Sequence, residues 1–206
     1  NVADYLDPVQ PAKNLKDPEK IAADIAARER EQVEKAGLDW NLARIVAIGS
    51  WAEDIQPARV ELGITDSYEI EAIAEFWRVA RDRHLIGFCI RSFDLPTLIQ
   101  RSRYLRLAVP PISLDRYRSR DLTDLFDLLT FNDQYGATTV MRRSLKSFAR
   151  RFGIPVTDPV NGRDIREAVD AGDLAGGRAH VTSDVMLTMA RAQRLGVLTL
   201  TPEPVI

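Results

Sequence analysis

The chain contains very few of the residues that build disulfides and zinc centres. Its 206 residues include one cysteine, Cys89, and two histidines, His84 and His180. A single cysteine excludes an internal disulfide, and two histidines are too few for a three-His zinc site or a paired-His zinc finger. The sequence therefore predicts an intracellular, cytoplasmic protein without zinc.

Long hydrophobic runs and several familiar motifs are also missing. The longest candidate run, Ile45 to Ala52, is interrupted by Gly49 and Ser50 and is far shorter than the ~20 apolar residues that cross a bilayer. The chain has no Gly-x-Gly-x-x-Gly, phosphate-binding Gly-Lys-Ser/Thr, Gly-x-Ser-x-Gly or His-Glu-x-x-His segment. These absences argue against membrane contact, nucleotide cofactors, serine hydrolysis and zinc proteolysis.

Neither sign of charge dominates the composition. There are 28 Lys and Arg residues against 30 Asp and Glu, which gives a net charge of -2. An anionic partner would therefore have to be met by a local basic patch. The length and the 45% hydrophobic content suit one core, so the prediction is a single domain over residues 1–206.

Apolar periodicity alternates between strand and helix patterns along the chain. Short β-branched runs predict strands at 43–52, 55–64 and 84–90, the first two as a hairpin. Asp17-Pro18-Glu19 is typical of a helix start, and Asp66-Ser-Tyr-Glu69 has the form of a capping box. The expected helices are 17–35, 66–83, one that begins near Asp94 or Pro96, 121–133, 144–152, 162–171 and 177–195. This order predicts an α/β or α+β fold with a mixed sheet.

Two acidic positions at the ends or faces of apolar elements could carry chemistry. Asp94 follows the predicted strand 84–90, which is where open α/β sheets place ligand groups. The alternative is that Asp94, or Ser92, only caps the next helix. His180 and Asp184 lie one turn apart on the last helix, beside its core-facing stripe. Their alternative is a surface hydrogen bond.

Together these two segments resemble motifs of a known family. Gly87-Phe-Cys-Ile-Arg-Ser-Phe-Asp94-Leu-Pro is similar to Gly-Phe-Asn-x-x-x-Phe-Asp-x-Pro, the second motif of DEDD-group 3'-5' exonucleases, with Cys89 in place of Asn. His180-x-x-x-Asp184 is similar to their third motif, Tyr-x-x-x-Asp. The closest resemblance is to predicted exonucleases related to the proofreading domain of family B DNA polymerases.

The resemblance covers most of the chain and implies a fold. Further similar segments are Leu38 to Gly49, Asp121-Leu122, Ser144-Leu145 and Phe152-Gly-Ile-Pro155. The fold implied is α/β, a ribonuclease H-like mixed sheet flanked by helices. One departure is that the Asp-x-Glu strand of the family's first motif is not visible between Asn1 and Leu38. Either that motif lies upstream of Asn1, or the chain is a catalytically degenerate module that binds nucleic acid or protein.

The resemblance also implies an activity and its metal ions. It implies hydrolysis of phosphodiester bonds at DNA 3' ends with two ions of Mg²⁺ or Mn²⁺, held in part by Asp94 and Asp184. His180 would orient or deprotonate the attacking water. The implied partners are single-stranded 3' ends of DNA and a DNA polymerase or replication protein.

Arginines after Asp94 could hold the substrate. Seven arginines lie between residues 91 and 120, and a second basic run spans 142–151. Arginine binds phosphate through two parallel hydrogen bonds, so these runs could hold a single strand. The predicted substrate-binding residues are Arg91, Phe93, Arg142 and Arg143. The alternative is that the basic runs form solvated helix faces and internal ion pairs.

Overall fold

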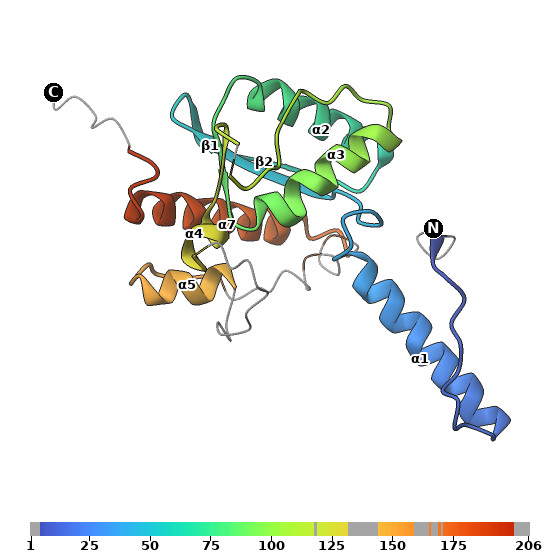
Figure 1. Ribbon diagram of the computed structural model, residues 1–206. Coiled ribbons are helices and arrows are strands. Elements are labelled where there is room, and N and C mark those ends of the chain that lie inside the picture. Colours follow the sequence, from blue (N-terminus) through green and yellow to red (C-terminus); the bar gives the residue numbers. More distant parts are fainter. Residues whose placement is uncertain are drawn as a thin grey trace, which may run out of the picture.

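The computed structural model describes residues 5–117, 119–131, 144–158, 165, 169 and 171–199, with the side chains of 55–57 left aside. Its first helix, α1 (Pro18–Ala36), confirms the helix predicted from Asp17-Pro18-Glu19. The Asp17 carboxylate accepts a hydrogen bond from the Glu19 amide, and Gly37 ends the helix. Figure 1 shows α1 extending away from the remaining elements. In the described part of the chain, no helix has the length and apolar character needed to cross a membrane.

A β-hairpin forms the centre of the molecule, as predicted. β1 (Ala47–Ala52) and β2 (Ile55–Leu62) are antiparallel, with Ala47 opposite Leu62 and Ser50 opposite Arg59. β1 is half-buried along its length rather than fully buried. Among the described residues β1 pairs with β2 alone, so no strand covers the other edge of β1.

Helices cover both faces of this hairpin. On one face, Ile48 packs against the hydrophobic cluster of α2 (Asp66–Ala80) and α3 (Leu95–Tyr104). On the other face lies α7 (Leu174–Arg194). A Cβ at Gly49 would lie 2.6 Å from atoms of both Val181 and Val185, so this strand position requires glycine. Because successive residues of a strand point to opposite faces, the hairpin separates α2 and α3 from α7.

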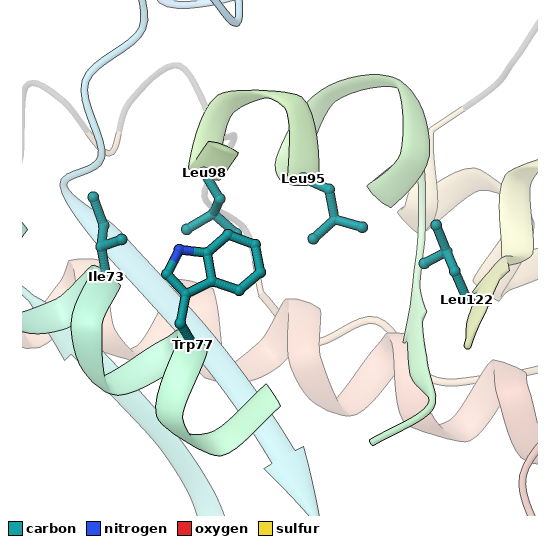
Figure 2. Close-up of a cluster of buried hydrophobic side chains, with 5 residues drawn as sticks. All are labelled: Ile73, Trp77, Leu95, Leu98 and Leu122. Carbon is teal, nitrogen blue, oxygen red and sulfur yellow. The ribbon is translucent and has the colours of Figure 1, made fainter. Parts of the chain in front are cut away.

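The hydrophobic core lies between α2 and α3. Figure 2 shows Leu95 and Leu98 of α3 directed toward the Trp77 ring of α2, and Ile73 and Leu122 complete the cluster. The Trp77 indole N–H donates to the Ser102 hydroxyl at 2.8 Å. This hydrogen bond satisfies the polar atom of a large ring that is otherwise buried among apolar side chains.

A buried ion pair joins the same two helices. Glu69 is 1% exposed, and both of its carboxylate oxygens accept hydrogen bonds of 2.7 Å from the Arg101 guanidinium. The predicted capping role of Glu69 is wrong, because the residue that caps α2 is Thr65, whose hydroxyl accepts from the Tyr68 amide. The Glu69 side chain turns inward instead, where the Ile45 amide also donates to it at 2.9 Å.

A short parallel strand pair completes the sheet structure. β3 (Leu85–Gly87) pairs with β4 (Leu122–Asp124), with Gly87 opposite Asp124. The helix predicted over 121–133 is therefore wrong in its first residues, because buried Leu122 contributes to the core from a strand. α4 (Leu125–Leu129) and α5 (Leu145–Arg151) follow. Small sheets flanked by helices confirm the predicted α/β class, while most of the predicted helix 162–171 lies outside the described residues.

Candidate functional site

The chain leaves β3 through a tight, well-fixed turn. A Cβ on Gly87 would lie 2.6 Å from the Ile90 side chain, so the strand must end in glycine. The Asp124 carboxylate accepts hydrogen bonds of 3.0 Å from the amides of Cys89 and Arg91. The π-helical turn η2 (Ile90–Asp94) then leads into α3. The fold thereby holds Asp94 at the junction of η2 and α3.

The Asp94 carboxylate does not cap the following helix. Its backbone is already helical, at φ -64°, and its side chain makes no capping hydrogen bond. The Ser92 hydroxyl donates to the Cys89 carbonyl at 3.2 Å, so Ser92 is not the cap either. The helix-cap alternative for both residues is therefore wrong.

The surroundings of Asp94 disfavour the negative charge of its carboxylate. Its side chain reaches solvent. Even so, desolvation by the surrounding protein, followed by the negative charge of Asp124, raises the pKa of Asp94 to about 6. Among the described residues, none donates a hydrogen bond or an ion pair to it. A cation bound here would relieve both causes of the shift.

The second acidic locus lies on α7, around a buried histidine. His180 is 4% exposed, so it enters the protein interior rather than flanking it, and the surface alternative is wrong for this ring. Its Nε2 lies 3.4 Å from Oδ2 of Asp184, one turn further along α7. The Asp184 side chain is 40% exposed. The pair therefore runs from the interior toward solvent.

Asp158 is a member of this locus that the sequence did not reveal. It lies in the segment after α5, and its Oδ2 is 2.5 Å from Nδ1 of His180. The Lys146 ammonium of α5 approaches the same oxygen at 3.1 Å. No spacing rule connects residue 158 with residue 180, because only the packing of separate segments brings them together.

Three atoms of metal-ligand type meet in this locus. Asp158, His180 and Asp184 each offer one such atom, and the three atoms lie within 4.8 Å of one another. Oδ1 of Asp184 is a buried atom that has no hydrogen-bond partner within the described ranges of the chain. Burial foremost, and also the charge of Asp158, raises the pKa of Asp184, against the opposing charges of His180 and Lys146. An orphaned carboxylate oxygen beside an imidazole fits a divalent cation.

Several arginines of the first basic run are committed to internal partners. Arg91 is 12% exposed, lies 3.2 Å from Asp127 and donates to the carbonyls of Leu114 and Asp115. Arg116 lies 2.8 Å from Asp127. With Arg101, these residues confirm the alternative of internal ion pairs at three of the seven positions. In the described parts of the two basic runs, the exposed arginines whose side chains make no hydrogen bond or ion pair with another described residue are Arg106, Arg120, Arg150 and Arg151.

The remaining predicted residues are placed in part. Phe93 is half-buried beside Asp94, and its carbonyl accepts from the Thr97 hydroxyl at 2.7 Å. Arg142 and Arg143 lie outside the described residues. Burial and the neighbouring negative charges, that of Asp124 first, raise the pKa of the Cys89 thiol to about 12, which makes it unreactive at neutral pH.

One Asp-x-Glu triplet precedes Leu38, and its place is unlike that of a metal-binding strand. The triplet, Asp17-Pro18-Glu19, opens α1 and is exposed. Figure 1 shows that this end of α1 is the one farther from the other elements. Between residue 5 and Leu38, the described chain consists of an irregular arm and α1, without a strand.

The fold and the two acidic loci define the class of protein. Small sheets flanked by helices, with acidic residues after β3 and on α7, are consistent with a ribonuclease H-like exonuclease domain. Residues 38–195 match the family of predicted 3'-5' exonucleases related to the exonuclease domain of PolB, and the chain belongs to this family. The resemblance identified from the motifs is thereby confirmed, and it implies a nucleic-acid substrate. No curated protein and no solved structure shows significant similarity to the chain.

Proposed function

We propose that this protein is a metal-dependent exonuclease that removes nucleotides from single-stranded 3' ends of DNA. The observation that carries the proposal is the state of Asp94. Its carboxylate caps no helix, has no donor among the described residues and has a pKa raised to about 6. A bound cation would offset both causes of the raised pKa, the desolvation of the carboxylate and the negative charge of Asp124.

Asp94 and Asp184 are the proposed metal ligands. Bound divalent cations would supply charge neutralisation at the phosphate and a lower pKa for the attacking water, in a two-metal mechanism with Mg²⁺ or Mn²⁺. Asp94 would contribute its exposed carboxylate, and Asp184 its orphaned Oδ1. His180, beside Asp184, would accept the proton of the attacking water.

The exposed arginines are the proposed contacts for the DNA strand. Arg150 and Arg151 belong to the last turn of α5, the helix that also carries Lys146 next to the His180 locus. Guanidinium groups in solvent can pair with phosphates without breaking internal ion pairs. This leaves Arg91, which holds three protein partners, as the weakest of the predicted phosphate contacts.

The test is degradation of 5'-labelled single-stranded DNA with added Mg²⁺ or Mn²⁺. We expect ladders that shorten from the 3' end, no reaction with EDTA, and a loss of at least about 100-fold in rate for both Asp94→Asn and Asp184→Asn. Asp82→Asn is the matched control, because Asp82 is an exposed aspartate whose positive φ suits Asn. Variants that degrade DNA at the wild-type rate would overturn the assignment of both ligands.

A second function is favoured by one specific observation. The Asp-x-Glu triplet before Leu38 opens α1 and is not on a strand, so the described chain shows Asp94 and Asp184 in a suitable setting but not the Asp-x-Glu pair of the first motif. Without the other pair, the protein would be a nuclease-like module that binds nucleic acid or protein but does not cleave DNA. Fluorescence anisotropy with single-stranded DNA distinguishes the two functions, because binding without metal-dependent shortening supports the module and contradicts the enzyme.

A further inference from the structure

The short contact between His180 and Asp158 determines how the ring is protonated. Nδ1 of His180 lies 2.5 Å from Oδ2 of Asp158, and both side chains are at least nine-tenths buried. Two lone pairs cannot approach this closely in a dry setting, so Nδ1 carries a proton and donates it to the carboxylate.

The other ring nitrogen is placed differently. Nε2 lies 3.4 Å from Oδ2 of Asp184, which is longer than a normal hydrogen bond between these atoms. On a neutral ring with a proton on Nδ1, Nε2 holds a lone pair directed toward the Asp184 side. That side is also the more open one, since the Asp184 side chain is 40% exposed.

We propose that Asp158 is a positioning residue that holds His180 in the Nδ1–H tautomer, so that Nε2 accepts the proton of the attacking water. This inference rests on the proposed function, in which His180 acts on that water. The Asp158 carboxylate acts through the ring and does not touch the substrate. Its negative charge also stabilises the imidazolium that forms when Nε2 takes up the proton.

Lys146 supports Asp158 from α5. Its ammonium lies 3.1 Å from Oδ2 and 3.3 Å from the backbone carbonyl of Asp158, so one cation holds both the side chain and the main chain. Asp158 is 9% exposed. A carboxylate oxygen shared by an ammonium and an imidazole N–H is better suited to orienting the ring than to binding a further cation.

The first test is the tautomer of His180, observed by ¹⁵N NMR on the neutral ring in alkaline solution. The chain has two histidines, so a His84→Gln variant assigns the spectrum unambiguously. We expect protonated Nδ1 and unprotonated Nε2 in the metal-free wild type. A ring protonated on Nε2 would overturn the proposal.

The second test replaces the carboxylate with its isostere. Asp158→Asn removes the negative charge that holds the proton on Nδ1, so we expect the Nε2–H tautomer of His180 to become populated. We also expect kcat to fall between about 10²- and 10⁴-fold with KM unchanged, and Asp158→Glu to recover part of the loss. If Asp158→Asn keeps the wild-type tautomer, the carboxylate does not set it and the proposal fails.

Lys146→Met tests whether the tautomer of His180 depends on Asp158 itself or on any charge in the cluster. This variant removes one charge from the same cluster but leaves the contact between His180 and Asp158 intact, so the Nδ1–H tautomer should persist. A tautomer change as large as that of Asp158→Asn would contradict the assignment to Asp158.

The two proposals fail in distinguishable ways. If the wild type does not degrade DNA but His180 has the expected tautomer and Asp158→Asn changes it, the proposed function fails while the positioning by Asp158 stands. If DNA is degraded and Asp158→Asn matches the wild type in both tautomer and kcat, the enzyme stands and the positioning role fails.

Discussion

Glu69 and Asp94 are two carboxylates that border the same hydrophobic cluster and are treated in opposite ways by the fold. Glu69, one turn before Ile73, is buried with the Arg101 guanidinium and the Ile45 amide as donors. Asp94, next to Leu95, has no such donor in the described part of the chain and has a raised pKa. The comparison teaches that a buried acid can be structural, and that the informative acid is the one whose charge the fold leaves uncompensated.

Two arginines, one half-buried and one fully buried, repeat this contrast. Arg101 makes two hydrogen bonds to Glu69, whereas Arg191 of α7 is 0% exposed and finds no hydrogen-bond partner for Nε and Nη1 among the residues that the structure describes. Its guanidinium lies 5.2 Å from the ring centroid of Phe88 and 5.8 Å from that of Phe148, and Nη2 donates to the Leu145 carbonyl. Burial lowers the pKa of Arg191 to about 10. Among the described residues, buried polar atoms without a hydrogen-bond partner therefore occur on α7, at Asp184 and Arg191, and also on α2, at the Tyr68 hydroxyl.

The largest expected effect on stability comes from breaking the ion pair between Glu69 and Arg101. Arg101→Met removes both hydrogen bonds of one guanidinium to buried Glu69 and leaves the Ile45 amide and Arg44, whose Nε lies 3.4 Å from Oε2. We expect the free energy of unfolding to fall by about 3 kcal/mol. Urea unfolding of the metal-free protein measures the change. Arg103→Met, on the exposed face of the same helix, is the matched control and should change stability by less than about 0.5 kcal/mol. Equal effects of the two variants would contradict the comparison.

Replacement of Arg191 should raise the free energy of unfolding, in contrast to replacement of Arg101. Arg191→Met removes two unsatisfied donors from the interior and replaces them with apolar volume, at the loss of two ring contacts and of the hydrogen bond to the Leu145 carbonyl. We expect a gain of about 1–2 kcal/mol in the free energy of unfolding. Thermal unfolding at matched ionic strength checks this sign, and a destabilised Arg191→Met would show that the ring contacts outweigh the missing hydrogen bonds.

Asp94→Asn should stabilise the metal-free protein at neutral pH. The pKa of Asp94 is about 6 in the folded state against an ordinary value of 3.8, so the folded state holds the proton more tightly and stability falls as the pH rises through this window. Because the group reaches solvent, we expect a gain of only about 1 kcal/mol. The gain should be absent below the ordinary pKa of 3.8. Denaturant unfolding at several pH values tests this, and a gain that does not depend on pH would contradict the charge argument.

The smallest expected effect concerns the turn that presents Asp94. Cys89 has a φ of 58°, a left-handed conformation that Asn adopts more readily than most residues. Cys89→Asn should therefore raise the free energy of unfolding by about 0.5 kcal/mol. Cys89→Ala removes the thiol without this conformational preference, so calorimetry should find no gain for that variant.

Local sequence determined the elements that depend on neighbouring residues. The helix after Asp17, the hairpin around residues 53 and 54, and the position of α7 are all set by capping residues and by hydrophobic periodicity, and each was predictable. The motifs around Asp94 and Asp184 were likewise sufficient to indicate the family. Over such short separations along the chain, the secondary-structure preference depends on the residues of the segment itself.

Tertiary structure decided everything that depends on contacts between distant segments. Glu69 has the spacing of a capping residue but binds the Arg101 guanidinium. Arg101 lies on another helix, so no local sequence pattern predicts this contact. Leu122 begins a strand because β3 lies beside it, although residues 121–133 have the sequence pattern of a helix. Asp158 reaches His180 across 22 positions of the chain. Burial, ion pairing and hence the charge state of each acid are properties of the packed molecule, so only the fold could distinguish the structural carboxylate from the candidate ligands.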